Sequence, residues 1–191
     1  MRQLNVIWLT VIVMLLAGCA APKPSAKSEF YLLSAPPLPH RQIDLSSELM
    51  VVGPVTVADY LKRASIVTVR SKNHYDISKL DQWGGGIEGE IQLALLKNLS
   101  SLNADNTYVR YSGLANSVGA YNLRVDVLRF DANLNGDARL EASWAWIDKD
   151  RKVVSAGLYS KTNRAGSTIE QSVAAQSELL KMLSQEVLTG F

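Results

Sequence analysis

The segment YNLRVDVLRFDANLNGDARLEASWAWIDKDRKVVSAGLYS, residues 121–160, decides the fold. In three of its stretches, 121–127, 140–147 and 153–160, apolar residues recur at every second position. That spacing places them on one face of a β-strand. Turn-forming NLNGD and DKDR separate the stretches. Short polar turns between alternating strands are typical of antiparallel hairpins, so the segment predicts a three-stranded β-meander.

Each predicted strand of this meander has one apolar face. In the first strand the alternation slips after Val127, where Leu128 follows directly, and such a slip often marks a β-bulge. Trp144 and Trp146 share a face of the second strand, and we expect them in the core, with a lipid-facing surface as the alternative. The faces comprise Tyr121, Leu123, Val125 and Val127, then Leu140, Ala142, Trp144 and Trp146, then Val154, Ala156 and Leu158.

Two segments outside the meander have the spacing of amphipathic helices. Residues 87–102 are apolar at positions 87, 91, 94, 95, 99 and 102, which places one stripe on a helix. Leu93 and Leu96 widen the stripe, so the helix is either deeply buried or a contact surface for a partner. The second helix opens with Ser167 and Glu170, a capping box, and should pack across the sheet. Its apolar face comprises Ile169, Val173, Leu180, Leu183 and Val187.

The N-terminal half adds further strands. Residues 29–33 are a strand candidate between two irregular stretches, which suggests an edge element. LMVVGPVTV at 49–57 predicts a strand with a bulge or an edge position, and ASIVTVR at 64–70 predicts another after a turn or short helix. We therefore predict a single α+β domain over residues 29–191. Its sheet is mixed or antiparallel, with a β-meander in the C-terminal half and two longer helices packed on one face.

Composition and motifs exclude several classes of function. The 20 Lys and Arg residues nearly balance 18 Asp and Glu, so the chain lacks the basic footprint of a nucleic-acid-binding protein. His40 and His74 each lack a second ligand at metal-site spacing, and we expect both in solvated loops. No GxSxG or Ser-x-x-Lys nucleophile signature occurs. We therefore predict no catalytic residue, no metal, no cofactor and no enzymatic activity.

Three glycines, Gly84 to Gly86, precede the first predicted helix. They could expose backbone N–H groups to a phosphate or a lipid headgroup. However, the Lys-Ser/Thr of a P-loop is missing, and the acidic residues Glu88 and Glu90 follow. We prefer a flexible start to the helix, with the two carboxylates stabilising its N-terminus.

Residues 1–18 have the layout of a secretory signal peptide. Arg2 precedes the apolar run VIWLTVIVMLL, and the small residues Ala17 and Gly18 follow it. A membrane-spanning helix is the alternative, but a span takes about 20 apolar residues, and this run reaches that length only when several polar residues are counted. Leu16, Ala17, Gly18 and Cys19 resemble the lipobox of bacterial lipoproteins.

The lipobox resemblance implies a modification of Cys19, the only cysteine of the chain. In bacterial lipoproteins the signal is cleaved before this cysteine, which then carries an S-diacylglycerol group and an N-acyl chain such as palmitate. Two or three acyl chains hold a protein durably on a bilayer. Ala20, in place of Asp, resembles lipoproteins that are sent to the outer membrane. Residues 19–28 would then form the acylated N-terminus and a flexible linker.

Several motifs recur in a characteristic order along the rest of the chain. They are the early strand from Phe30 to Leu33, the segment VVGPVTVADYLKRASIVTVR, Trp83 opening a helix that ends in LLKNL, the VDVLRFD strand and a Gln-Ser-rich last helix. Together with the lipobox, this order resembles the auxiliary lipoproteins of ABC-type, MCE-linked intermembrane transporters, and the Pqi-type lipoprotein most of all. One departure is the glycine run after Trp83, where the family often has Ala-Glu-Pro.

The family resemblance implies a non-enzymatic part of a lipid-trafficking machine of the cell envelope. The protein would be anchored in the outer membrane, facing the periplasm, in contact with outer-membrane lipid. It would dock the tunnel of an MCE-domain protein, support membrane integrity, and act as a single copy or a homo-oligomer. Trp83, Leu93 and Leu96 are the candidates for facing that partner. The alternatives are a structural or assembly lipoprotein and a cell-wall-associated envelope lipoprotein without a transport role.

Overall fold

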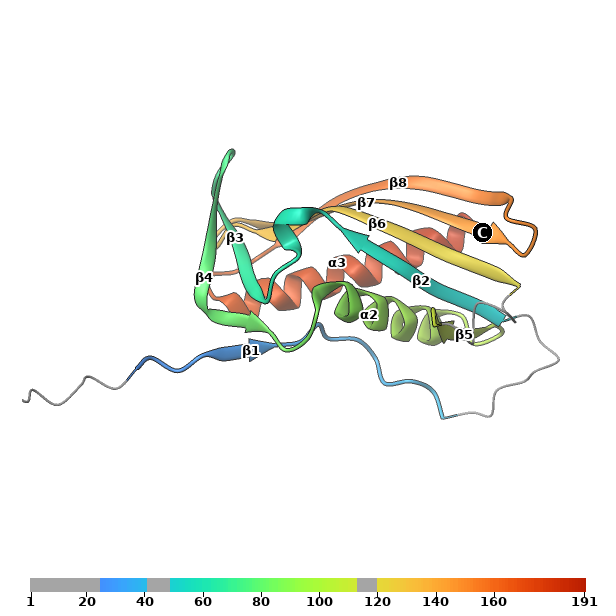
Figure 1. The fold of residues 1–191 in the computed structure, drawn as a ribbon, viewed down its shortest axis with the longest axis horizontal. Helices are drawn as coiled ribbons and strands as arrows, with labels where there is room; N and C mark the ends of the chain where they lie inside the picture. Colours follow the sequence, from blue (N-terminus) through green and yellow to red (C-terminus); the bar gives the residue numbers. More distant parts are fainter. Residues whose placement is uncertain (1–24, 41–48, 113–119) are drawn as a thin grey trace, which may run out of the picture.

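The computed structural model describes residues 25–40, 49–112 and 120–191. In this part of the chain eight strands form one mixed sheet, and two α-helices lie along one of its faces (Figure 1). The predicted α+β class is therefore confirmed. The strands are β1 (Glu29–Tyr31), β2 (Leu49–Val57), β3 (Ser65–Ser71), β4 (His74–Trp83), β5 (Thr107–Arg110), β6 (Tyr121–Ala132), β7 (Asp137–Asp148) and β8 (Val153–Arg164). The helices are α2 (Ile87–Leu102) and α3 (Ile169–Thr189), and a 3-10 helix, η1 (Asp59–Leu61), joins β2 to β3.

The β-meander of β6, β7 and β8 is confirmed. β6 pairs antiparallel with β7, and β7 pairs antiparallel with β8. The register of β6 against β7 shifts between Val127 and Arg129, where the alternation of the sequence slips. Asn135 and Arg151 have positive φ values of 66° and 64° in the two turns, the left-handed conformation that tight turns between strands require.

β6 is the strand along which the rest of the sheet is organised. On the edge opposite β7, β2 runs parallel to the first half of β6, and β3 pairs with its end through Thr68 and Ala132. β5 continues the sheet beyond β2, and β4 and then β1 continue it beyond β3. β2 is thus an interior strand, and its register shift between Val52 and Val55 supports the predicted bulge rather than an edge position.

Both helices pack on the same face of the sheet and complete the core with it (Figure 1). α2 has the predicted bounds, and its apolar face is buried except at the half-buried Leu93 and the exposed Leu102, which favours a deeply buried helix. α3 buries Val173, Leu180, Leu183 and Val187 as predicted. Trp146 is completely buried beneath α3, and its Nε1–H donates a 2.9 Å hydrogen bond to the Val187 carbonyl.

The sequence prediction missed β4 and the short β5. The β4 sequence HYDISKLDQW is polar along most of its length, and most of its residues are exposed or half-buried. It therefore lacks the apolar alternation that marks a half-buried strand. His74 begins β4 and so is exposed on a strand rather than in a loop. Trp83 ends β4 instead of opening α2, because the glycine run lies between them and Gly86 is the N-cap of the helix.

The N-cap of α3 is Thr168 rather than Ser167. Its side chain accepts a 3.2 Å hydrogen bond from the Gln171 backbone N–H. The Gln171 side-chain oxygen in turn accepts a 2.8 Å hydrogen bond from the Ser167 backbone N–H. The pair Thr168 and Gln171 has the same spacing as Ser167 and Glu170, but the Gln171 side chain bonds the N–H of Ser167 rather than that of the N-cap Thr168, so the pair forms a variant of the capping box.

Candidate docking surface

Alternation along the meander strands assigns their two faces. Leu123, Val125 and Val127 of β6 are buried under the helices together with Trp144 and Trp146 of β7. Ser143 and Ala145, one position away on β7, therefore point to the opposite face of the sheet. Leu158 of β8 pairs directly with Ser143 and shares that face, where its side chain is 83% exposed.

We call this surface the open face, because its side chains are exposed or half-buried within the described ranges. One row crosses four strands, from Leu158 to Ser143, Asp126 and Thr56. Thr56 Oγ1 donates a 2.6 Å hydrogen bond to Asp126 Oδ1 at the end of this row. A shallow groove of about 380 Å³ lies along it. The open face comprises Thr56, Arg124, Asp126, Ser143, Ala145, Ala156 and Leu158.

The apolar residues Val154, Ala156 and Leu158 of β8 face away from the helices, and the residues on the helix-covered side of β8 explain why. Gly157 lies under the indole ring of Trp144, and a Cβ at this position would come within 2.8 Å of ring carbons. The covered side of β8 therefore requires glycine at this point. Tyr159, two residues further along the same side, is buried and donates a 3.2 Å hydrogen bond to the Leu179 carbonyl of α3. Val154, Ala156 and Leu158 are left on the exposed side.

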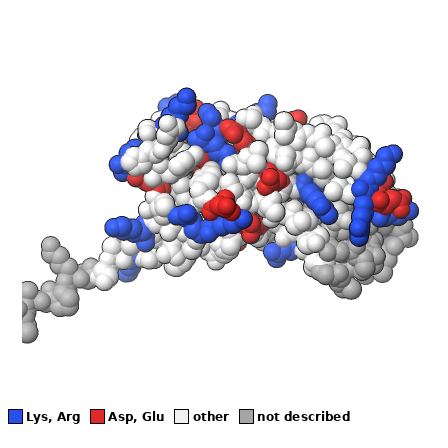
Figure 2. All heavy atoms as spheres, turned by 45° about the horizontal axis from the view of Figure 1, so that its top comes forward, with Lys and Arg blue, Asp and Glu red and all other residues white. Residues whose placement is uncertain are grey.

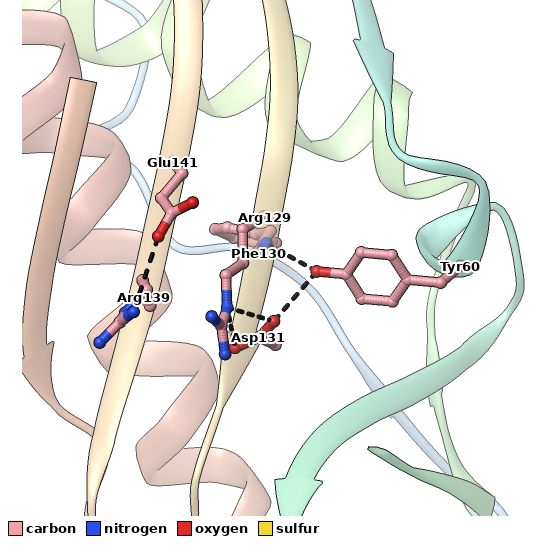
Figure 3. A network of polar contacts seen from close by, with 6 residues as sticks. All are labelled: Tyr60, Arg129, Phe130, Asp131, Arg139 and Glu141. Carbon is pink, nitrogen blue, oxygen red and sulfur yellow. Dashed lines mark hydrogen bonds and ion pairs between the residues drawn. The ribbon is translucent and has the colours of Figure 1, made fainter. Parts of the chain in front are cut away.

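One end of the sheet face that contains the open face carries a charged network (Figure 3). Asp131 is 2% exposed, and its two carboxylate oxygens accept hydrogen bonds of 3.1 and 3.0 Å from Arg129 Nε. The Tyr60 hydroxyl of η1 donates a 3.0 Å hydrogen bond to Asp131 Oδ2 and accepts one from the Phe130 backbone N–H. Arg139 and Glu141 of β7 form a separate ion pair beside them, at 3.6 Å (Figure 3).

The electrostatics of this network indicate a structural role. Burial, together with the negative charge of Asp131, raises the pKa of the Tyr60 phenol well above its usual range. Burial alone would lower the pKa of Arg129, but its hydrogen bond to Asp131 and the charge of that carboxylate raise it overall. Tyr60 thus stays a proton donor and Arg129 stays charged near neutral pH. The network fastens η1 to β6, and its groups are already satisfied by one another.

Charges over the rest of the visible surface are mixed. Figure 2 shows basic and acidic residues interspersed, with uncharged surface between them, and no broad area of one sign. Among the described residues there is no cluster of three or more His, Cys, Asp or Glu side chains that could hold a metal ion. The helices in these ranges are also too short or too polar to cross a membrane.

The sequence-predicted site residues fall into two groups. Leu16, Ala17, Gly18 and Cys19 lie outside the described residues, so acylation and cleavage remain expectations.

The three residues predicted to face a partner lie in or against the core. Trp83 is 6% exposed and its ring stacks on Phe130, with the ring centroids 6.4 Å apart. Leu96 is buried, and Leu93 is half-buried against the core. The prediction for Trp83 and Leu96 is corrected, because packing under the sheet leaves these two little surface for a partner. The open face was not predicted, since alternation alone does not say which face the helices cover.

Comparison with known protein families identifies the chain. Residues 31–188 match the model of the ABC-type transport auxiliary lipoprotein component. The chain belongs to this family. The match runs from the last residue of β1 to the end of α3 but for its final residue, and so includes the open face and the charged network of this auxiliary lipoprotein. No curated protein matches the sequence.

Two solved structures share the fold of this auxiliary lipoprotein. A protein described as uncharacterised has a TM-score of 0.71 at 18% identity, covering 86% of this chain and 98% of its own. A protein from Xanthomonas campestris has a TM-score of 0.64 at 15% identity, covering 85% of this chain and 93% of its own. At these identities the likeness concerns the fold alone.

Proposed function

We propose that this auxiliary lipoprotein serves an MCE-type intermembrane lipid transport system at the outer membrane. The observation that carries the proposal is the family match over residues 31–188, which makes the chain a transport component. The motif order of the sequence resembles the members linked to MCE proteins. In this role the protein docks the far end of a periplasmic tunnel, and lipid passes between the membranes without a chemical step at this subunit.

The anchor in this proposal is Cys19. Cleavage before Cys19 and acylation of its sulfur and amino group would hold the mature chain in the outer membrane, facing the periplasm. Residues 20–28 then act as a spacer of roughly 28 Å when extended, at about 3.1 Å per residue. The folded domain would therefore lie close to the membrane and at the end of the tunnel.

The open face is the surface best suited to receive the MCE-domain partner. It combines an exposed apolar side chain, Leu158, with small residues and the opposite charges of Arg124 and Asp126. A small, partly apolar surface with a polar rim is the composition of a docking interface. Several copies of the chain around one tunnel are compatible with this arrangement.

The anchor is tested by Cys19→Ala in cells that produce the protein. We expect the mature wild-type protein to float with outer-membrane vesicles and to show a diacylglycerol and an acyl chain by mass spectrometry. Cys19→Ala should release it from that fraction, whereas Ser28→Ala in the linker should not. Full retention of Cys19→Ala in the outer membrane would refute the anchor.

The partner is tested by purification of the tagged protein from mildly solubilised envelopes. We expect an MCE-domain protein to co-purify with the wild type and to be lost with Leu158→Arg. Gln185→Arg, on the exposed side of α3, is the matched control and should retain it. Recovery of a barrel-assembly or cell-wall protein in its place would contradict the transport role.

A further inference from the structure

β1 and the adjoining end of β4 carry an exposed apolar patch. Phe30 is 66% exposed and pairs with Gln82, and Leu80, two residues before Gln82 on β4, is also exposed, at 39%. Leu32 is 61% exposed and covers Gly84, because a Cβ on that glycine would lie 2.7 Å from Leu32 Cδ2. We call Phe30, Leu32 and Leu80 the β1 patch.

The core does not need these three side chains. The other face of β1 supplies the packing, because Tyr31 pairs with Trp83 and both Tyr31 and Leu33 pack against the core. The carboxylates of this strand pair also belong to that other face. Tyr31 Oη lies 2.7 Å from Glu29 Oε2 and 3.2 Å from Asp81 Oδ1. A solvent-facing side of a sheet is usually polar, so an apolar one indicates a contact surface.

The position of the β1 patch in the chain indicates what it contacts. Cys19 lies ten residues before Glu29, a distance of at most roughly 36 Å when the chain is fully extended. The intervening residues include Lys23 and Lys27 and no carboxylate, so this segment is attracted to anionic lipid headgroups. Among the described strands, β1 is an outermost one, paired with β4 alone, and Figure 1 shows it at the periphery of the molecule.

We propose that the β1 patch is a membrane-contact surface that rests on the phospholipid bilayer. The proposal builds on the anchor at Cys19, which brings β1 close to that bilayer. Phe30, Leu32 and Leu80 enter the boundary between headgroups and acyl chains, and Lys27, just before β1, contacts the phosphates. An acyl anchor alone leaves the domain free to rotate on its linker. The patch supplies a second contact and so fixes which side of the domain faces the membrane.

The test measures the patch without the anchor. The mature chain with Cys19→Ala is mixed with vesicles of phosphatidylethanolamine and phosphatidylglycerol, and the bound fraction is measured by flotation. We expect weak binding that Phe30→Asp reduces by roughly tenfold, the change expected when one large apolar side chain no longer leaves water. Val153→Asp, at an exposed apolar residue of β8 that belongs neither to the β1 patch nor to the open face, should bind as the parent does. Thermal melting should be unchanged in both, because both side chains are exposed.

Each outcome decides the proposal. Equal binding of the three proteins, or no binding by the parent, would overturn it. Self-association of the parent that Phe30→Asp abolishes, seen by analytical ultracentrifugation, would assign the patch to a second copy of the chain and also overturn it. Failure of the Cys19 anchor would appear instead in the cell fractionation, which this anchor-free measurement does not depend on. The two proposals can therefore fail separately.

Discussion

The two faces of the meander show how similar apolar residues serve different purposes. On the helix-covered face, Trp144 and Trp146 are buried, and Trp146 is hydrogen-bonded to α3. On the open face of the same strands, Leu158 is almost fully exposed beside Ser143 and Ala145. The strands alternate regularly through both sets, and only the location of the helices distinguishes them. The covered face holds the fold together, whereas the open face is free for a partner.

The sharpest test of this contrast substitutes one residue on each face. Trp146→Ala removes a completely buried ring and its hydrogen bond, so we expect a loss of about 3–5 kcal/mol in the free energy of unfolding. Leu158→Ala should change it by less than about 0.5 kcal/mol. Urea denaturation followed by circular dichroism measures both values. Similar losses at the two positions would show that the open face also belongs to the core.

The charged network supplies a second test, because Asp131 is buried although it lies on the sheet face that the helices leave uncovered. Asp131→Ala removes the acceptor for Tyr60 and Arg129, and we expect a loss of about 2 kcal/mol in the free energy of unfolding. Asp126→Ala, in the exposed row, is the control and should cost less than about 0.5 kcal/mol. The same urea titration applies. An Asp131→Ala protein as stable as the wild type would contradict the role of this network in fastening η1 to β6.

A smaller loss of stability is expected from a substitution at the N-terminus of α3, one of the two helices that cover the sheet. Thr168→Ala removes the side-chain acceptor at the N-cap, and we expect a loss of about 1 kcal/mol. Ser167→Ala retains this acceptor and should be nearly neutral. Thermal melts of the two variants distinguish the observed cap from the one that the sequence predicted. A larger loss for Ser167→Ala would place the cap at Ser167 after all.

High pH should weaken the covered face through Tyr159. Burial raises the pKa of its phenol to about 12, from a usual value of 10.0. Between these pH values the unfolded chain releases the proton while the folded chain retains it, so stability falls as pH rises. Tyr159→Phe should therefore lose less stability than the wild type between pH 9 and pH 11. Melting temperatures measured across this range check the slope, and parallel curves would refute the assignment.

The sequence predicted most of the strands and helices that the core requires. The meander, the bulge after Val127 and the bounds of α2 follow from apolar periodicity, because each of these elements buries one face. β4 was missed since its two faces are nearly equally exposed, which removes that periodicity. The position of Trp83 was wrong because Trp83 was assigned to the start of the helix, whereas it ends β4 and the glycine run separates it from α2.

The candidate docking surface could not be predicted in the same way. Alternation groups Val154, Ala156 and Leu158, but it does not say whether helices cover them. A signal was present in Gly157, which interrupts the other face of β8 where Trp144 needs room. This signal can be interpreted only when it is known that Trp144 of β7 pairs with Gly157. Leu96 failed as a partner-facing candidate for the reverse reason, since a wide apolar stripe on a helix is as compatible with complete burial as with an interface.

Photocrosslinking in intact cells tests the docking account most directly. A photoreactive amino acid is placed at Leu158 on the open face and, in a separate strain, at Gln185 on the exposed side of α3. The account predicts that the Leu158 position yields a crosslinked product containing an MCE-domain protein, and that the Gln185 position does not. The same product from both positions, from Gln185 alone, or from neither would contradict the proposal that the open face docks the transport partner.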